Sequence, residues 1–412
     1  MEPIYELFLE ALRAALENRQ VDWDAGVSPE QMYQLTELAN QHHVLPLIFE
    51  AVYSCPATTA MDGVVFMQCK RATVQSVMSQ AMKTEDFLAL NRHLRANGVT
   101  PVVVKGLICR NLYPHPDYRT SGDEDLLCGE HQFKACHKAM IEFGMEPSAS
   151  SLESYEVPYR KEDSPLYIEL HKSLFQRESD IFSDCNRFFD DCFDRLIEVD
   201  VQGDPVATLN HTDHMLYLIF HAFKHFLHSG FGIRQVCDMV LYANAFGSQI
   251  DWDYVQTKCR GLRAEKFAAA LFAIGEKHLV FSPDQACYPH SWRNLKVDGE
   301  ALLADLLYGG IYGSSDRSRV HSSNMTLNAV SADKKGKNSN GNLLKTIFPP
   351  AKSLEKRFPY LRRAPFLLPI AWTSRIFVYA KETISEPESA AAEVIRTGSK
   401  RIDLLRHYDI ID

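Results

Sequence analysis

The segment 102–128 holds the residues whose types and spacing are best suited to chemistry. A β-branched run at 102–104 is broken by a lysine and a glycine, and a second apolar run begins beside Asp123 and Asp125. If the second run is a strand, Asp123 and Asp125 share one face while Glu124 points away. Two neighbouring carboxylates repel each other unless a cation lies between them, and Mg²⁺ is commonly held by carboxylates and phosphates. The pair therefore predicts a magnesium site, the alternative being a solvated turn or strand end.

This segment resembles the signature of a known enzyme family. The matching residues, in chain order, are Lys105-Gly106, Leu112-Tyr113-Pro114, Arg119 and Gly122-Asp123-Glu124-Asp125-Leu126-Leu127. They are similar to the K-G…L-Y-P…R…G-D-x-D-L-L pattern of a little-characterised nucleotidyltransferase family in the polymerase-β-like nucleotidyltransferase superfamily. The resemblance implies an α+β fold, with a minimal polymerase-β-like nucleotidyltransferase sheet embedded in a mostly helical protein.

A third acid is expected on a second strand, at 166–171. Strict alternation of apolar and polar residues places Glu169 and His171 on the same face of that strand. In polymerase-β-like enzymes a third carboxylate on a neighbouring strand completes the metal site, and the Glu-Leu-His segment here is similar to that motif. The resemblance therefore implies that Glu169 joins Asp123 and Asp125 as a catalytic and metal-binding acid. His171 is expected nearby, in the substrate cleft.

The residues next to the acids imply a place for phosphates. By the same resemblance, Lys105 and Arg119 supply positive charge to phosphate oxygens. Gly106, just after the first strand, would let backbone N–H groups approach a phosphate. The superfamily's usual Gly-Ser is Gly106-Leu107 here, so one hydroxyl contact to phosphate is missing. In the alternative interpretation, Lys105 points to solvent and Arg119 only pairs with one of the two aspartates.

A later helical segment carries a second group of candidates. His221 and His225, four residues apart, resemble the family's H-x-x-x-H segment, and Arg234 and Asp238 match its R-x-x-x-D segment. The resemblance implies that these helices line the substrate cleft, with His225, Arg234 and Asp238 as site residues. One alternative is a zinc site at the two histidines, although the glutamate of H-E-x-x-H is missing. Another is an Arg–Asp pair that only stabilises a helix.

Length and composition limit the class of protein. The chain has 412 residues, of which 46% are hydrophobic and 24% charged, and these are ordinary globular values. Its formal net charge of -9 argues against a general nucleic-acid binder. The sequence contains no apolar run of the roughly 18 residues that span a bilayer, and its 10 cysteines lack the spacing of common metal sites. We expect a cytoplasmic protein with buried, reduced thiols and no membrane partner.

The helical and strand patterns divide the chain into three regions. We expect an N-terminal helical region at 1–98, a nucleotidyltransferase catalytic core at 99–205 and a helical C-terminal region at 206–412. Within the last region, residues 313–342 are rich in Ser, Asn, Lys and Gly and poor in large apolar residues. This composition predicts a flexible loop.

The predicted activity is metal-dependent nucleotidyl transfer. An NMP group would move from an NTP, by default ATP, to an acceptor hydroxyl, with release of pyrophosphate and with Mg²⁺ or Mn²⁺ as cofactor. The acceptor is open: a small molecule, a protein or an RNA end. The alternatives are a non-catalytic nucleotide-sensing or partner-binding module on the same fold, and a metal-dependent phosphohydrolase.

Overall fold

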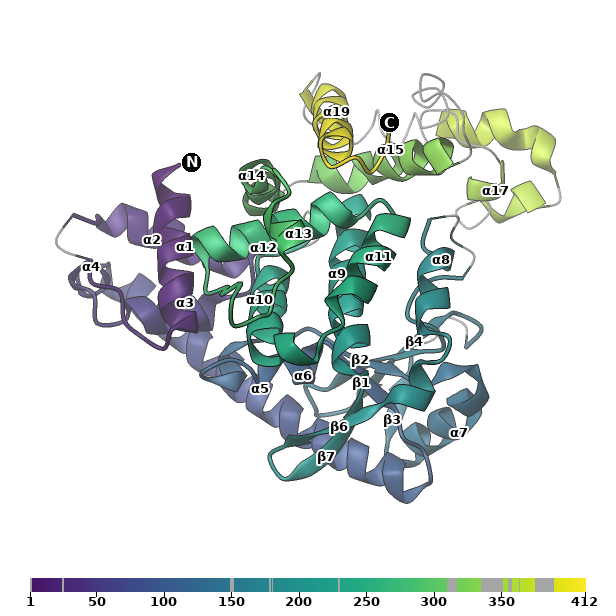
Figure 1. Cartoon of the computed structure of the whole chain (residues 1–412), viewed down its shortest axis with the longest axis horizontal. Helices are drawn as coiled ribbons and strands as arrows, with labels where there is room; N and C mark the ends of the chain where they lie inside the picture. The colour runs from purple at the N-terminus through teal and green to yellow at the C-terminus, as the bar shows by residue number, and fades with distance from the viewer. Residues whose placement is uncertain are drawn as a thin grey trace.

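The computed structural model describes most of the chain. The described residues are 2–23, 26–148, 152–177, 179, 181–228, 230–309, 317–334, 351–354, 358–362, 364–374 and 389–412. They form an α+β protein in which one mixed sheet is surrounded by helices (Figure 1). The predicted fold class is therefore confirmed.

Seven strands form one mixed sheet in the order β3-β4-β5-β2-β1-β7-β6. The strands are β1 (Val102–Val104), β2 (Glu124–Leu127), β3 (Met145–Pro147), β4 (Glu156–Lys161), β5 (Tyr167–His171), β6 (Ile197–Val201) and β7 (Asp204–Thr208). β2 is antiparallel to β1 and parallel to β5, and β1 is parallel to β7. The strands predicted to carry or adjoin the acids, β2 and β5, therefore lie side by side in the middle of the sheet.

The local pattern of each central strand explains its place. β1 consists of valines that are all buried, which suits a strand covered on both faces. In β5, Ile168 and Leu170 are fully buried, whereas Tyr167 and Glu169 on the other face are only partly buried. This alternation confirms the predicted strand and turns Glu169 away from the apolar layer.

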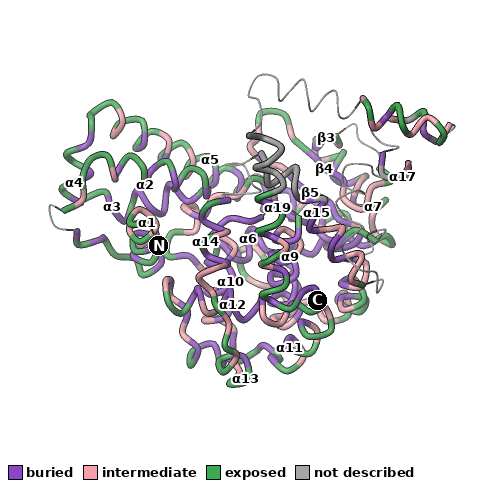
Figure 2. Tube along the Cα trace, turned by 90° about the horizontal axis from the view of Figure 1, so that it is seen from above, coloured by how far each residue is buried: buried purple, intermediate pink, exposed green. Residues whose placement is uncertain are grey.

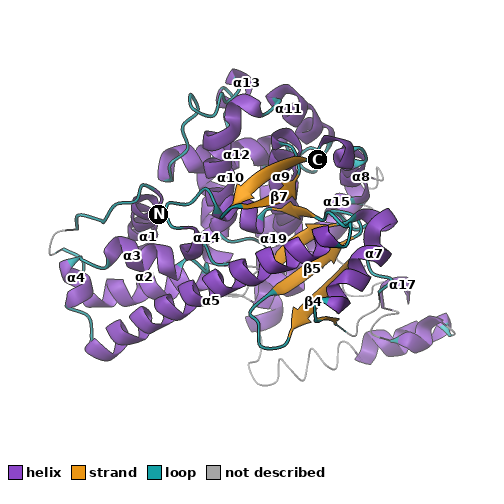
Figure 3. Cartoon of the chain, turned by 90° about the horizontal axis from the view of Figure 1, so that it is seen from below, coloured by secondary structure: helices purple, strands orange, loops and turns teal. Residues whose placement is uncertain are grey.

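Helices from the N-terminal part pack beside and beneath the sheet. They are α1 (Pro3–Leu16), α2 (Pro29–Gln41), α3 (Leu45–Val52), α4 (Pro56–Thr59) and α5 (Gly63–Ala96). Ser28 and Gln31 form a capping box that begins α2, and the Asp62 carboxylate caps the first turn of α5. α5, together with α7 (Gly129–Glu142), covers one face of the sheet (Figures 1 and 3).

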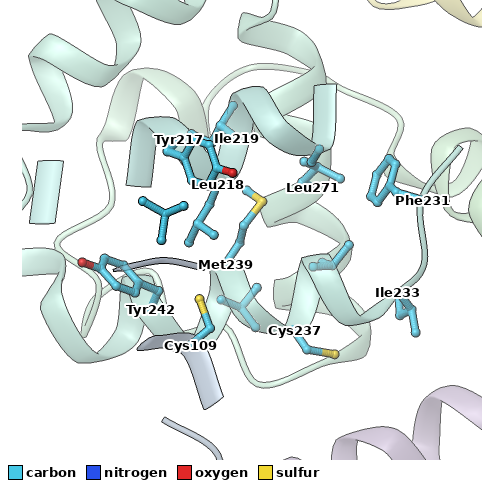
Figure 4. Packing of buried hydrophobic residues seen from close by; sticks show 14 of the residues in the cluster. Cys109, Tyr217, Leu218, Ile219, Phe231, Ile233, Cys237, Met239, Tyr242 and Leu271 are labelled. Atoms are coloured by element: carbon cyan, nitrogen blue, oxygen red, sulfur yellow. The ribbon is translucent and has the colours of Figure 1, made fainter. Parts of the chain in front are cut away.

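The opposite face of the sheet is covered by α9 (His211–His228) and α10 (Arg234–Phe246) (Figure 1). Tyr217 and Leu218 of α9 pack with Met239 and Tyr242 of α10 in the apolar interior (Figure 4). Figure 2 shows that buried residues are concentrated where these helices meet the rest of the molecule. Because α9 is buried over most of its circumference, its polar side chains on the sheet side are held in defined positions.

Shorter helices complete the described chain. The α-helices are α6 (Gly106–Arg110), α8 (Ser183–Asn186), α11 (Trp252–Gly261), α12 (Glu265–His278), α13 (His290–Arg293), α14 (Gly299–Gly309), α15 (Arg317–Lys334), α17 (Ala351–Leu354) and α19 (Ser389–His407). The 3₁₀ helices are η1 (Pro116–Tyr118), η2 (Arg187–Phe189), η3 (Cys192–Arg195), η4 (Gly247–Gln249), η7 (Pro359–Arg362) and η8 (Pro365–Leu367).

The predicted flexible loop at 313–342 is wrong over 317–334, which form α15. The helix packs against α9 and α19, and the Thr326 hydroxyl donates to the Leu227 carbonyl at 2.7 Å. Ala329 and Val330 are buried in the main core. Tertiary packing therefore orders a polar segment whose composition alone favours a loop. The rest of the predicted loop, 313–316 and 335–342, lies outside the described residues.

A single cluster of buried apolar residues extends from Phe8 to Ile411. It crosses both predicted region boundaries, and β7 runs through the one placed at residue 205. Nine of the ten cysteines are buried and all ten are free thiols, while Cys287 is exposed. Within the described ranges, no helix is both long enough and apolar enough to cross a membrane.

Candidate functional site

Two neighbouring strands position the predicted acids. β2 and β5 are parallel, and their register pairs Asp125 with Glu169 and Leu127 with His171. Because paired side chains on adjacent strands project to the same face, Asp125, Glu169 and His171 come together. Asp123 immediately precedes β2 and lines the same pocket. The structure therefore brings the three acids named from the sequence to one place.

The pocket around these acids has a volume of about 280 Å³. Its walls come from β2 and β5, from the end of β1 and from α9. The lining residues are Lys105, Asp123, Asp125, Glu156, Glu169, His171, Leu174, Tyr217, His221, Lys224 and His225. Carboxylates from the sheet thus share one small pocket with lysines and histidines.

Asp125, Glu169 and His171 form a group that could hold a metal ion, because one ligand atom from each lies within 4.8 Å of the others. His171 Nε2 lies 3.0 Å from Asp125 Oδ1 and 3.8 Å from Glu169 Oε2. On the other side of the ring, Nδ1 lies 3.9 Å from the Glu156 carboxylate, which the β4–β5 register places opposite His171. Sequence reasoning missed Glu156, because only strand pairing brings it here.

The crowded carboxylates respond to their surroundings in opposite ways. Burial, together with the charges of Asp125 and Asp123, raises the pKa of Glu169 to about 7. Burial would also raise the pKa of Asp125, but the Lys105 charge and the His171 hydrogen bond outweigh it and lower that pKa. Burial tends to lower the pKa of His171, but the hydrogen bond that its ring donates to Asp125, together with the Asp125 charge, outweighs burial and raises that pKa. The pocket therefore holds more negative charge than its own cations neutralise.

Two observations test whether this donor set fits a divalent cation. Asp125, Glu169 and His171 each already offer one ligand atom within 4.8 Å of the other two. Burial and then the charges of Asp125 and Asp123 raise the pKa of Glu169, and a bound cation would relieve the repulsion between these acids. Carboxylate oxygens from Asp123, Asp125 and Glu169 are the ligands that Mg²⁺ and Mn²⁺ prefer. The residues present fit such an ion.

Lys105 lies in the pocket, as the phosphate-binding interpretation requires. Its Nζ is 3.7 Å from Asp125 Oδ2 and 3.3 Å from His221 Nε2. The residue has a φ of 62°, an uncommon conformation for a side chain with a Cβ atom. Its backbone N–H donates to His214 Nε2 at 2.9 Å, and burial lowers the pKa of His214 to about 3, which keeps that nitrogen an acceptor. His214 thus holds the unusual turn that aims Lys105 into the pocket.

One face of α9 forms the wall opposite the acids. Tyr217, His221 and Lys224 recur at helical spacing, and His225 follows directly. Burial and the nearby lysine charges lower the pKa of His221 and of His225 far below the usual histidine value, so both rings are neutral. Of these residues, the sequence analysis named His225 as a site residue and weighed His221 with it as a possible zinc site, and it gave Tyr217 and Lys224 no role in the site. Their shared helical face was the available signal.

Arg119 does not lie in the pocket, which corrects its expected phosphate role. Its buried guanidinium binds the Asp238 carboxylate through two hydrogen bonds, of 3.1 and 2.5 Å. The Tyr113 hydroxyl donates to the same carboxylate at 2.8 Å. Arg119 is therefore committed to a structural pair, and its partner is neither Asp123 nor Asp125. The pair ties the loop before β2 to α10.

Asp238 and Arg234 are likewise placed outside the pocket. The buried Asp238 carboxylate pairs with Arg119. The alternative expected from the sequence was a pair between Arg234 and Asp238 within one helix. Arg234 donates to the Thr120 carbonyl, in the loop that leads to Asp123. Both residues support that loop, whereas their expected role was to line the substrate cleft.

The structure gives Gly106 a different role from the expected one, which was to let a phosphate come close to the backbone. The Glu124 carboxylate accepts from the Leu107 N–H at 2.9 Å, at the start of α6. A Cβ atom at Gly106 would lie 2.1 Å from Glu124 Oε2, so only glycine leaves room for this carboxylate. Glu124, which points away from Asp125 as predicted, also pairs with buried Arg110. The N-terminus of α6, where a phosphate was expected, is therefore occupied by the Glu124 carboxylate.

Comparison with known proteins gives two matches. The model of a family described as "uncharacterised nucleotidyltransferase" matches residues 28–279. The crystal structure of an antigenic nucleotidyltransferase-like protein from Paracoccidioides brasiliensis is similar, with a TM-score of 0.32 and 11% sequence identity over 50% of this chain and 96% of that one. No curated protein matches the sequence significantly.

The family match includes both strands that carry the acids and the whole of α9. It also includes Arg119 and Asp238, which form the buried pair described above. Because the match extends over more than half of the chain, the protein belongs to the family of uncharacterised nucleotidyltransferases.

Proposed function

We propose that the protein transfers a nucleoside monophosphate from an NTP to an acceptor hydroxyl and releases pyrophosphate. The observation that carries this proposal is the pocket in which Asp123, Asp125 and Glu169 face Lys105 and Lys224. Carboxylates suit Mg²⁺ or Mn²⁺, and lysines suit the phosphates that such an ion accompanies. Membership of a nucleotidyltransferase family supports the same reaction class.

The proposed step forms one bond and breaks one. The acceptor oxygen bonds to the α-phosphorus, and the bond from that phosphorus to the bridging oxygen of the β-phosphate breaks; the hydroxyl proton leaves to solvent. A divalent ion held by Asp123, Asp125 and Glu169 would neutralise charge on the phosphates. Lys105 and Lys224 would bind the phosphates that depart as pyrophosphate, and neutral His225 would add a hydrogen bond to the same part of the pocket.

A second hollow, of about 510 Å³, provides room for the rest of the nucleotide. It shares Asp123 with the acidic pocket and is also lined by Arg160 and Tyr167. The Arg160 guanidinium lies 5.1 Å from the centre of the Tyr167 ring. Tyr167 is on the same face of β5 as Glu169, so a base stacked on this ring would extend from the acids along the strand.

The test is incubation of the protein with each labelled NTP and Mg²⁺ or Mn²⁺, alone and with cell extract. We expect pyrophosphate and a labelled adduct in equal amounts. Asp125→Asn should reduce the rate by at least about 100-fold, because the pocket loses a metal-binding charge. Glu146→Gln, which changes an exposed acid in β3, should leave the rate unchanged.

Other results would select one of the alternatives. Free nucleotide without an adduct would indicate a phosphohydrolase. Binding of nucleotide without turnover, under every acceptor condition, would indicate a sensing module. Full activity in Asp125→Asn would remove the acidic pocket from the proposal altogether.

A further inference from the structure

The outer face of α5 carries a line of exposed apolar side chains. The exposed fractions are 65% for Val64, 59% for Met67, 48% for Val74, 60% for Met78 and 51% for Met82. Scattered surface apolar residues are ordinary, but these five share one helix face and form an apolar stripe that is interrupted by Arg71. In the part of the chain that the structure describes, none of the side chains of this α5 stripe belongs to the buried core or packs against it.

The spacing of the α5 stripe is typical of a helix-pairing seam. Its members, with Arg71 included, follow one another at intervals of three or four residues, so they share one side of the helix. Figure 3 shows α5 lying across the outside of the molecule, with the sheet behind it. The opposite side of α5 is buried: Lys83 Nζ donates to the Ser121 and Gly122 carbonyls at 2.6 and 2.9 Å. The helix therefore already uses one face and leaves the other uncovered.

Two charges of opposite sign lie on the same helix face, one within the stripe and one just beyond its last residue, Met82. Arg71 and Glu85 are both exposed, and they stand seven residues before and seven residues after Met78. Residues seven apart occupy nearly the same side of a helix. In the part of the chain that the structure describes, neither has an ion-pair partner within 4.0 Å.

We propose that the α5 stripe pairs with the same stripe of a second copy of this chain, in antiparallel orientation. A two-fold axis beside Met78 pairs the 71–85 part of the stripe: Met78 lies next to its counterpart and Val74 at the same level as Met82 of the other copy, while Val64 and Met67 lie beyond the paired part. The same axis sets Arg71 opposite Glu85 on both sides of the contact. One helix face thus supplies both the apolar surface and the complementary charges.

This symmetry is the reason to choose a second copy over an unrelated partner. The segment from Arg71 to Glu85, with a positive charge at one end and a negative charge at the other, is complementary to itself only when it is reversed. A parallel pair would set each charge against its own kind. The antiparallel pair leaves no like charges in register.

The first experiment measures the mass of the full-length protein in solution by light scattering, across micromolar concentrations. We expect a dimer. Met78→Glu, which places like charges beside the axis, should shift the protein to monomer while its circular dichroism stays unchanged. Ile141→Glu, which changes an exposed apolar residue on α7, is the matched control and should remain dimeric. A monomeric wild type, or a Met78→Glu variant that stays dimeric, overturns the proposal.

Charge exchange tests the orientation. Arg71→Glu alone and Glu85→Arg alone should each weaken the dimer, since each sets like charges against one another at two places. The two changes together restore opposite charges, so the double variant should dimerise like the wild type. Weakening that persists in the double variant would contradict the antiparallel register.

Cysteine cross-linking separates the two orientations directly. In a Cys287→Ser background, which removes the exposed native thiol, Met78→Cys should give a disulfide-linked dimer on mild oxidation. Val64→Cys should not, because in the antiparallel pair the two copies of residue 64 are about 42 Å apart, at 1.5 Å per residue. Efficient cross-linking at residue 64 would indicate a parallel pair and would contradict the proposal.

Discussion

At the scale of single residues, the pocket gathers more acids than its cations balance. Ionisation of Glu169 is unfavourable in the folded protein, because burial and the charges of Asp125 and Asp123 raise its pKa to about 7. A carboxyl with a raised pKa favours its protonated form in the folded protein. The ionised form therefore destabilises the metal-free fold above pH 7, and this cost disappears as the pH falls toward 4.5, the group's ordinary pKa.

The first prediction concerns stability rather than activity. In EDTA at pH 8, Glu169→Gln should be more stable than the wild type by about 2 kcal/mol, a value reduced for the solvent that reaches this side chain. At pH 5 the gain should largely vanish, because the wild-type carboxyl is then protonated. Urea unfolding at both pH values measures this. Equal stability of the two proteins at pH 8 would show that Glu169 is not crowded by the aspartates.

Lys224 is a pocket lysine to which the sequence analysis gave no role in the site. Its proposed role, phosphate binding, can be tested separately from metal binding by the acids. Lys224→Met should raise the KM for the nucleotide about tenfold, which corresponds to about 1.4 kcal/mol of phosphate binding, with a smaller change in kcat. Lys138→Met, on the exposed side of α7, is the control. A lower kcat at constant KM would place Lys224 at the reacting phosphorus instead.

At the scale of elements, the loop between α6 and β2 decides where Asp123 lies. Arg119 and Tyr113 tie this loop to Asp238 of α10, and Arg234 of α10 binds the Thr120 carbonyl. Lys83 of α5 holds the next two carbonyls from the other side of the sheet. Helices from both faces therefore fix the approach to β2.

The third prediction tests this structural role of Arg119. Arg119→Met should lower the free energy of unfolding by about 3–5 kcal/mol, because Asp238 is left as an uncompensated buried charge. The double variant Arg119→Met with Asp238→Leu should recover most of that loss, since it removes both charges. Chemical denaturation measures both changes.

Nucleotide affinity provides the contrast. The affinity of the folded double variant for nucleotide should stay within about threefold of the wild type, because Arg119 is remote from the lining of the acidic pocket. A large loss of affinity in this variant, with the fold restored, would return Arg119 to the phosphate-binding role that the sequence favoured.

At the scale of the whole molecule, a buried histidine joins the N-terminal helices to the C-terminal part. His42, at the end of α2, lies 3.3 Å from the Leu307 carbonyl of α14 and accepts from the Ile233 N–H at 3.5 Å. Its ring is 5.4 Å from that of Phe8. Burial is the main reason that its pKa is lowered to about 4. The fold therefore holds His42 neutral.

The fourth prediction is a loss of stability in mild acid. A lowered histidine pKa contributes stability above pH 6.5 that is lost as the pH falls toward 4. Between pH 7.5 and pH 5 this group should cost about 2 kcal/mol. His42→Gln should show a correspondingly weaker pH dependence in urea unfolding, whereas His407→Gln, at an exposed helix end, should behave like the wild type. An unchanged pH dependence in His42→Gln would count against this assignment.

The site shows how far local sequence information reaches. The alternation of Asp123, Glu124 and Asp125, and the placement of Glu169 on the polar face of its strand, follow from the two-residue repeat of a β-strand. That repeat depends only on neighbouring residues, so the sequence itself determined the strands, the shared face of the acids and the family signature.

The tertiary structure alone decided which distant side chains meet. Arg119 finds Asp238 across 119 positions of the chain, and Lys105 reaches His221 across 116. Nothing near Arg119 in the sequence distinguishes a buried ion pair from a phosphate ligand, because the choice depends on which helix packs over the loop. Local periodicity determines the face on which a residue lies, and only the packing of whole elements determines what that face meets.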